Sequence, residues 1–189
     1  MVTPTKRRAE DVIRGIESLS QERFLPIVGP AKGKLLEEVV QKQRPRLVLE
    51  VGTLVGYSAI LIARHLPPDG KLITLEINPD LARRARDNIR RAGLDQRITV
   101  IEGDALLTIP TIRGPFQTLF LDAAKEQYLK YLRLVESKLE KGGVAVADNA
   151  GVFASAMADY LEYVRESGRF RSRYHDFGFD GMEVSVKLG

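Results

Sequence analysis

The stretch LVLEVGTLVGYS at residues 47–58 decides the fold class of this chain. Its first five residues form an apolar run of the kind found in a strand that is buried on both faces. Gly52 follows this run directly, and Gly56 precedes a helical pattern that extends to Leu66. A strand, a glycine turn and a helix in succession predict the first unit of a doubly wound α/β sheet, whose turns lie at the ligand-binding carboxyl edge.

The spacing E-x-G-x-x-x-G, from Glu50 to Gly56, differs from the G-x-G-x-x-G fingerprint of dinucleotide folds and from the phosphate-binding P-loop. Glycine lets a backbone approach a bound molecule closely, although two glycines after a strand can also form only a tight turn. The acidic residue before the pair, and Tyr57 and Ser58 after it, favour a small-molecule site.

The composition is that of an ordinary single-domain protein, with 189 residues, 44% apolar and 29% charged. No apolar run reaches the length of a membrane span, and none follows Lys6, Arg7 and Arg8, so we expect neither a membrane anchor nor a signal peptide. The chain has no cysteine, which excludes a disulfide framework and a thiolate metal site. We therefore expect a cytoplasmic enzyme.

The chain is mildly basic, with a net charge of +4 and a sequence pI of about 9.4. This charge permits nucleic acid as a partner without requiring it. Arginines cluster in residues 83–91 and 165–173. We interpret both clusters as solvated surfaces, because no aromatic residues interleave with the charges as they do in RNA-binding motifs.

Strands and helices alternate along the chain, which predicts right-handed crossovers and a mostly parallel sheet. The last two strands are too close for a helical crossover, so one of them must run antiparallel. The fold class is therefore α/β: a Rossmann-like, doubly wound, seven-stranded sheet with helices on both faces. We expect one domain over residues 1–189, in which 1–44 form helices that cover the site and 45–189 form the sheet core. The other expected strands are 71–76, 97–102, 116–122, 144–148, 170–177 and 182–188. The expected helices are 5–19, 57–66, 78–92, 123–139 and 154–166, with one more that is marked by residues 35–40 and stops before Pro45.

Glu76 ends the second expected strand. An acid at this position accepts hydrogen bonds from both ribose hydroxyls in dinucleotide folds. The alternative is an exposed glutamate at a strand end. Because the glycine turn ends the preceding strand, we favour a ribose-binding role for Glu76.

Oxygen-bearing side chains also follow the fourth and fifth expected strands. Asp122 ends one, and Asp148 and Asn149 end the other. If these strands are neighbours, the three side chains converge and suit a hard divalent cation such as magnesium. Each aspartate alone would more often be a helix N-cap or a turn residue. Together they favour a metal site.

Lys125 lies three residues after Asp122. Near a bound cation and partly buried, a lysine has a lowered pKa and can act as a general base. The alternative is a solvated lysine in the first turn of a helix. The pattern of strands does not bring His65 or His175 close to Asp122, Lys125 and Asp148, so neither histidine is expected in the site.

These residues occur in blocks that resemble the metal-dependent O-methyltransferases of the catechol O-methyltransferase group. The fourth block is the most specific, and the C-terminal DGMEVSVKL resembles the last strand of the family. The blocks are VGPAKGKLLEEVV (28–40), VLEVGTLVGYSA (48–59), LITLEINPD (72–80), and LFLDAAKEQYL (119–129) with VADN (146–149).

The resemblance implies a role for each matching position. Asp122, Asp148 and Asn149 would bind Mg²⁺, Mn²⁺ or another divalent cation, and Lys125 would be the catalytic base. S-adenosylmethionine would lie with its methionine part against Val28 and its adenine near Asp104. The full set of expected cofactor-binding residues is Val28, Glu50, Gly52, Thr53, Gly56, Tyr57, Ser58, Glu76, Ile77, Gly103, Asp104, Ala105 and Asp122.

The chain departs from the catechol enzymes around the acceptor. In those enzymes tryptophans and a proline line the acceptor site as a wall, whereas this chain has no Trp. A catechol-contacting glutamate of the family is replaced around Tyr174, and the loop that plant enzymes use for coenzyme A esters is missing after Asn149. The expected wall positions are Phe24, Lys32, Ala124, Phe153 and Tyr174.

We therefore expect methyl transfer from S-adenosylmethionine to one hydroxyl of a small aromatic vicinal diol. Both diol oxygens would bind the metal, which lowers the pKa of the reacting hydroxyl, and Lys125 would take the proton. One alternative is methylation of a hydroxylated uridine in transfer RNA on the same scaffold, for which the arginine clusters are the only support. Another is a non-catalytic module that only binds S-adenosylmethionine. A homodimer is compatible with the sequence, and no membrane partner is expected.

Overall fold

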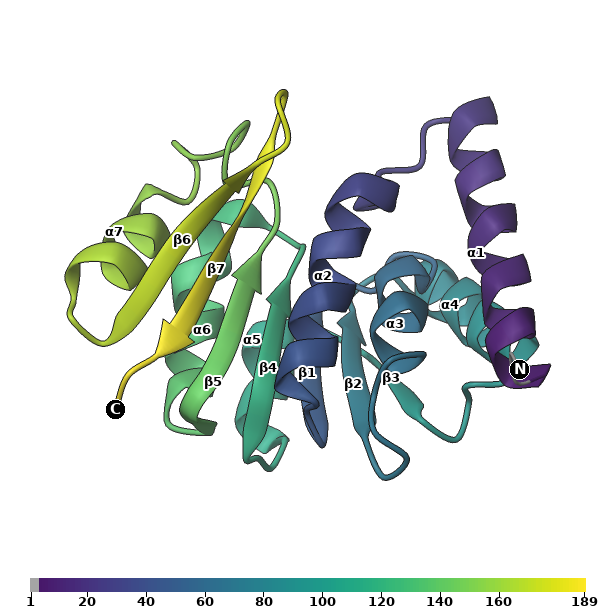
Figure 1. Ribbon diagram of the computed structural model, residues 1–189, viewed down its shortest axis with the longest axis horizontal. Coiled ribbons are helices and arrows are strands. Elements are labelled where there is room, and N and C mark those ends of the chain that lie inside the picture. The colour runs from purple at the N-terminus through teal and green to yellow at the C-terminus, as the bar shows by residue number, and fades with distance from the viewer. Residues whose placement is uncertain (1–3) are drawn as a thin grey trace.

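The computed structural model describes residues 4–189, so residues 1–3 of the expected domain lie outside the described part. Within it, seven strands form one sheet in the order β3-β2-β1-β4-β5-β7-β6 (Figure 1). Strands β1 to β5 are parallel, whereas β7 runs antiparallel to both β5 and β6. The prediction of a mostly parallel sheet with one antiparallel strand near the C-terminus is confirmed. The strands are β1 (Leu47–Val51), β2 (Lys71–Glu76), β3 (Ile98–Glu102), β4 (Phe116–Leu121), β5 (Leu139–Ala147), β6 (Phe170–Asp176) and β7 (Gly181–Lys187).

Helices cover both faces of the sheet, as the sequence predicts (Figure 1). One apolar cluster joins α1, α2, α3 and α4 to one face, and a second joins α5, η1, α6 and α7 to the other. The helices are α1 (Pro4–Glu22), α2 (Gly29–Gln43), α3 (Tyr57–Ala63), α4 (Pro79–Ala92), α5 (Ala105–Thr108), α6 (Tyr128–Glu136) and α7 (Ala158–Glu166), and the short 3₁₀ helices are η1 (Ile109–Thr111) and η2 (Lys125–Gln127).

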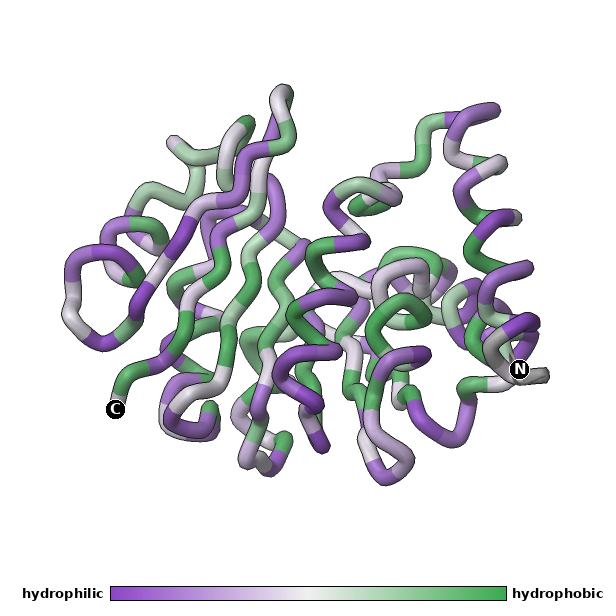
Figure 2. The backbone as a smooth tube through the Cα atoms, viewed as in Figure 1, coloured by the Kyte–Doolittle hydropathy of each residue, from purple (hydrophilic) through white to green (hydrophobic). Residues whose placement is uncertain are grey.

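The period-two alternation of strand side chains produces these two cores. In β1, Val48 packs into the first cluster and Leu49 into the second. In β4, Phe120 packs into the first and Leu119 into the second. Each such side chain contributes about 1.5–3 kcal/mol when it is fully buried. Apolar residues consequently predominate in the central strands (Figure 2). Their packing on both faces holds the carboxyl ends of the strands in a fixed relation.

The boundaries differ from the sequence prediction in the C-terminal half. Strand β5 begins at Leu139 rather than at residue 144, because Leu139 pairs with Phe116 across a register shift. The helix expected over 123–139 therefore ends at Glu136. Helices α5 and η1 were missed, since segments of four and three residues show no helical period.

Helix α7 begins at Ala158 rather than near Ala154. Residues between Asn149 and α7 form turns instead. The reason is tertiary: the backbone N–H of Ala150 donates to the carbonyl of Gly181 at 2.9 Å, which ties this segment to the start of β7.

The two N-terminal helices lie on one side of the sheet (Figure 1). Helix α1 packs on α3 and α4, and α2 packs on α3, β4 and β5. Within residues 4–189, no helix combines the length and the apolar character that a membrane crossing requires.

Candidate active site

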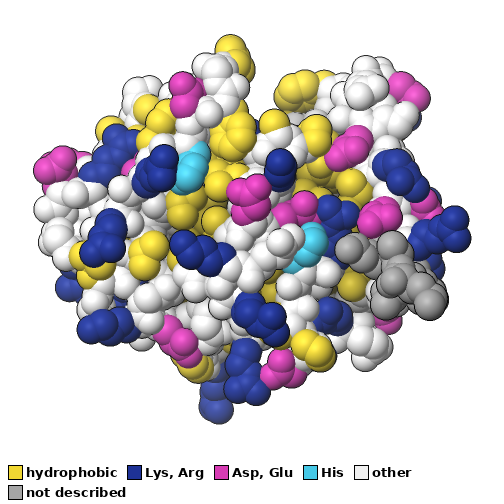
Figure 3. All heavy atoms as spheres, in the orientation of Figure 1, with side chains coloured by type: hydrophobic (Ala, Val, Ile, Leu, Met, Phe, Trp, Pro, Cys, Tyr) yellow, Lys and Arg dark blue, Asp and Glu magenta, His cyan; other side chains and the backbone are white. Residues whose placement is uncertain are grey.

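A cleft of about 780 Å³ opens at the carboxyl ends of the parallel strands. The segment between α1 and α2 borders one side and the β6–β7 turn borders the other, and hydrophobic side chains gather in the recess between them (Figure 3). Of the residues predicted from sequence, the cleft is lined by Phe24, Val28, Gly52, Thr53, Tyr57, Ser58, Glu76, Ile77, Gly103, Asp104, Ala105, Asp122, Ala124, Lys125, Asp148, Asn149 and Phe153. Most of the predicted site therefore lies around one cavity.

Gly52 directly follows β1 and lies against the backbone of Asp122, which directly follows β4. Its φ of +99° is in the region that favours glycine. A Cβ on Gly52 would lie 2.0 Å from the carbonyl oxygen of Asp122. The glycine is thus required by the packing of two strand ends, independently of any ligand.

Glu76 turns a buried carboxylate toward the cleft. One oxygen accepts a hydrogen bond from the backbone N–H of Leu54 at 2.8 Å, and the other accepts one from the N–H of Asn78 at 3.0 Å. The side chain therefore joins the glycine turn to the start of α4. Two carboxylate oxygens offer about four acceptor positions, so Glu76 retains the capacity to accept hydrogen bonds from a ligand.

Glu50 lies beneath the cleft and is fully buried. Within the described chain, neither of its carboxylate oxygens accepts a well-aligned hydrogen bond. Burial raises the pKa of Glu50 to about 8, and the hydroxyls of Ser58 and Thr74 act in the opposite direction. A buried acid of this kind favours a cationic group above it, because a nearby positive charge stabilises the ionised form.

Asp122 and Asp148 lie at the ends of the neighbouring strands β4 and β5. The backbone N–H of Asp148 donates to the carbonyl of Leu121 at 2.9 Å, which sets the two aspartates side by side. Burial and the adjacent carboxylate of Asp122 raise the pKa of Asp148 to about 6, although Lys32 opposes this effect. Asn149 follows directly and adopts a φ of +61°.

The donor set suits a hard cation. Asp148 Oδ1 is buried and lies 2.7 Å from the Lys32 ammonium, but within the described chain it accepts no well-aligned hydrogen bond. Two carboxylates side by side at one edge of the sheet fit a divalent cation with oxygen ligands. Among residues 4–189, no three His, Cys, Asp or Glu side chains form a metal cluster. The side-chain amide of Asn149, which lines the same cleft, offers a further oxygen beside the two carboxylates.

Lys125 is the first residue of η2, and its side chain returns toward the strand ends. Its ammonium lies 2.9 Å from Asp122 Oδ1 and donates to the phenol oxygen of Tyr128 at 2.8 Å. Tyr128 is fully buried, and burial raises its pKa well above the ordinary value. Tyr128 therefore presents a neutral hydroxyl that fixes the position of Lys125.

Four predicted residues lie outside the cleft lining. Glu50 is beneath it, Gly56 begins α3, and Lys32 reaches Asp148 from α2. Tyr174 does not line the cleft either, since its ring packs over Gly151 and Gly181: a Cβ on Gly181 would lie 2.3 Å from it. Tyr174, which is one of the expected wall residues, lines a shallow groove beside α2 and not the cleft.

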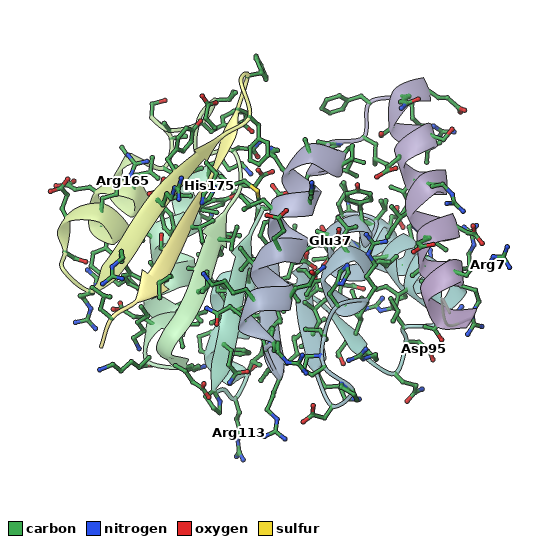
Figure 4. All side chains as sticks on the ribbon, in the orientation of Figure 1. Arg7, Glu37, Asp95, Arg113, Arg165 and His175 are labelled. Atoms are coloured by element: carbon green, nitrogen blue, oxygen red, sulfur yellow. The ribbon has the colours of Figure 1, made fainter. Side chains whose placement is uncertain are left out.

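The two histidines are separate from the cleft. His65 contacts Glu37 of α2 at 3.1 Å, and His175 lies on β6 beside the shallow groove. Figure 4 labels Glu37 and His175 on these two elements. The arginines of α4 form exposed pairs along the helix, including Arg83 with Asp80, in keeping with a solvated face.

The sequence analysis missed several residues that shape the site. Tyr128 holds Lys125, and Phe179 borders the cleft with 90% of its surface exposed. Glu17 of α1 accepts a 2.5 Å hydrogen bond from the Tyr57 hydroxyl. Two of the residues that shape the site carry a sequence signal: Tyr128 lies in the LFLDAAKEQYL block, and Asp180 begins the DGMEVSVKL block.

The sheet order and the cleft at its carboxyl edge define a Rossmann-like fold of the methyltransferase class. The O-methyltransferase family model matches residues 17–167. Catechol O-methyltransferase B of Danio rerio is 40% identical over 98% of this chain and 75% of its own length. Catechol O-methyltransferase of Sus scrofa is 39% identical over 86% of this chain and 93% of its own.

Solved structures agree with this assignment. The O-methyltransferase of Bacillus cereus in complex with SAH superposes with a TM-score of 0.84 at 28% identity, covering 99% of this chain and 93% of that one. TomG of Streptomyces achromogenes, in complex with SAM, gives 0.83 at 27% identity and covers 95% and 90%. This chain belongs to the O-methyltransferase family and is similar to the catechol O-methyltransferases. It is an enzyme of the S-adenosylmethionine-dependent O-methyltransferase class.

Proposed function

We propose that this protein transfers the methyl group of S-adenosylmethionine to one hydroxyl of a small aromatic vicinal diol, in a reaction that requires a divalent cation. The observation that carries the proposal is the convergence of Asp122, Asp148 and Asn149 at adjacent strand ends. The ammonium of Lys125 donates a hydrogen bond to Asp122 in the same place. The same cleft extends to Glu76 and the glycine turn, so cofactor and acceptor can occupy it together.

The cofactor-binding residues act on different parts of S-adenosylmethionine. Glu76 accepts hydrogen bonds from the ribose hydroxyls, and Asp104 with Ile77 borders the adenine. Val28 and Tyr57 border the methionine part, over the buried acid Glu50. The methyl group thus points toward the strand ends that carry Lys125.

The acceptor residues hold the diol and remove its proton. Asp122, Asp148 and Asn149 would bind Mg²⁺ or Mn²⁺, which when bound supplies Lewis-acid polarisation of the two diol oxygens. Lys125 would act as the base in its neutral amine form, after its ammonium has released a proton to solvent, and would accept the proton of the reacting hydroxyl. The oxygen then attacks the methyl carbon, and the carbon–sulfur bond breaks in line with that attack to leave S-adenosylhomocysteine. Phe24, Ala124 and Phe153 border the aromatic ring. Fixing two reactants in this geometry supplies much of the barrier reduction.

An assay with a labelled methyl donor tests this proposal. Catechol should be methylated in the presence of Mg²⁺, and excess chelator should abolish the reaction while circular dichroism shows a folded protein. Mn²⁺ should restore activity, since it shares the preference for oxygen ligands. Phenol supplies one oxygen instead of two and should be a poor substrate.

Transfer RNA in the same assay serves as the competing acceptor. Full activity in excess chelator, or equal rates on catechol and phenol, would contradict the proposed mechanism. Methylation of transfer RNA without methylation of catechol would contradict the proposed acceptor.

A further inference from the structure

Asp180 lies at the end of the β6–β7 turn, outside the cleft lining, and receives four hydrogen bonds. Its Oδ2 accepts from Asn149 Nδ2 at 2.6 Å and from Lys32 Nζ at 2.8 Å. Its Oδ1 accepts from the backbone N–H groups of Val152 at 3.1 Å and Gly151 at 3.3 Å. One carboxylate thus joins the C-terminal hairpin to α2 and to the segment that follows β5.

The contact with Asn149 settles the orientation of its side-chain amide. An ionised carboxylate only accepts hydrogen bonds, so the NH₂ end of the amide must face Asp180. The Lys32 ammonium and the backbone N–H groups of Gly151 and Val152 also donate to this carboxylate, so all of its partners treat Asp180 as an acceptor. The carbonyl end of the amide is therefore left for the cleft that Asn149 lines.

The backbone of Asn149 needs the same support. Its φ of +61° is left-handed, a conformation that costs non-glycine residues of order 1–3 kcal/mol and persists where the surroundings impose it. The N–H groups of Gly151 and Val152, two and three residues later, are the ones that Asp180 accepts. Both the backbone and the side chain of Asn149 are thus fixed by one carboxylate.

We propose that Asp180 is a positioning residue for the divalent-cation site, which turns the amide oxygen of Asn149 toward the cation. This inference rests on the proposed function, because it presupposes that Asp122, Asp148 and Asn149 bind a cation. Asp180 itself does not line the cleft that cofactor and acceptor are proposed to share. Its effect is therefore on cation affinity rather than on cofactor affinity.

Titration of Mn²⁺ into the folded protein, followed by the electron paramagnetic resonance signal of free Mn²⁺, measures the predicted effect. Asp180→Asn keeps the size of the side chain but removes the acceptor that faces Asn149. Loss of an outer partner of a metal ligand typically weakens binding roughly 10–100-fold, and we expect a loss in this range. Asp176→Asn is the matched control: it lies on the same hairpin, its carboxylate accepts from the N–H of Gly178, and it should leave Mn²⁺ affinity unchanged.

A Lys32 variant separates two ways in which Asp180 could act. Lys32→Met removes the cation that lies 2.7 Å from Asp148, so Mn²⁺ should bind at least as tightly as in the wild type. The double variant with Asp180→Asn should remain weak, because Asn149 stays unsupported. If Asp180→Asn causes no loss of affinity relative to Lys32→Met alone, Asp180 acts only by holding Lys32, and the inference is wrong.

Two further readouts do not depend on the cation. The NH₂ protons of the Asn149 amide should exchange slowly with solvent in the wild type and rapidly in Asp180→Asn, and S-adenosylmethionine affinity should be equal in both. If Asp180→Asn does not fold, Asp180→Glu keeps the negative charge, moves the carboxylate by one methylene and should weaken Mn²⁺ binding.

The outcomes separate the inference from the proposed function. A wild-type protein that binds no Mn²⁺ overturns the proposed cation site and this inference with it. A wild-type protein that binds Mn²⁺ while Asp180→Asn binds it equally well overturns only the inference.

Discussion

The ammonium of Lys125 lies 2.9 Å from the Oδ1 atom of Asp122. Asp122 directly follows β4, and Lys125 comes three residues later in the chain. Tyr128 holds the other side of the same ammonium. Lys125 is thereby fixed at the strand end where the proposed acceptor binds, in a position to exchange a proton with it.

Lys125→Met should reduce turnover on catechol by roughly 10²–10⁴-fold, the usual contribution of a positioned acid–base group. Cofactor affinity should hardly change, because the ammonium contacts Asp122 and Tyr128 rather than the ribose side of the cleft. Steady-state kinetics and calorimetry measure the two quantities. Lys130→Met, an exposed lysine on α6, is the matched control, and equal turnover in both variants would show that Lys125 is not the base.

Glu76→Ala should weaken S-adenosylmethionine binding by about 1.5–3 kcal/mol, the contribution of a hydrogen bond to a charged group. Glu102 provides a matched control, because it ends β3 directly opposite Glu76 in the strand register and is exposed. Glu102→Ala should leave the affinity unchanged by calorimetry. The ribose assignment is wrong if the two variants bind the cofactor equally well.

Gly52→Ala should destabilise the fold beyond the cost of a positive φ alone. The new Cβ would lie 2.0 Å from a backbone carbonyl oxygen that cannot move aside without disturbing β4, and overpacking of this kind typically costs about 1–3 kcal/mol. Gly178→Ala is the control, since Gly178 has a φ of +89° with no atom within 4 Å of its Cβ position. Urea unfolding measures how much free energy of unfolding each variant loses relative to the wild type, and the difference between the two losses is the steric effect. Equal losses in the two variants would show that there is no steric effect at Gly52.

Glu50→Gln should remove a pH dependence of stability. The pKa of Glu50 is about 8 in the fold, against an ordinary value of 4.5. The neutral acid is the form that the fold favours, so its contribution is fully present below pH 4.5 and is lost as the pH rises through 8.

The cofactor-free wild type should therefore lose free energy of unfolding relative to Glu50→Gln between pH 5 and 8, by at most about 1.4 kcal/mol per pH unit. Asp148 titrates in both proteins, so the difference between them reports Glu50. Urea unfolding across this pH range measures it, and a difference that is constant with pH would show that Glu50 ionises normally.

The sequence alone determined the order of strands and helices and the residues at the strand ends. Period-two apolar runs and glycine turns are local signals, so β1, its turn and α3 could be placed without any tertiary information. Resemblance to a family then implied the same roles for Asp122, Lys125 and Asn149 and added cofactor roles for Val28 and Asp104. It could not place Tyr174, whose ring turns away from the cleft to pack over two glycines.

Only the tertiary structure decided which distant groups meet. Asp180 reaches Asn149 from 31 residues away, and Glu17 reaches Tyr57 from 40 residues away. The start of α7 was displaced because the preceding backbone hydrogen-bonds to the β6–β7 hairpin. A hydrogen bond requires a donor–acceptor distance of about 3 Å, and for residues far apart in the chain this distance depends on how the elements pack. Such contacts produce no periodic pattern in the sequence. Burial of one face of a strand or helix does produce such a pattern, and it can therefore be predicted from the sequence.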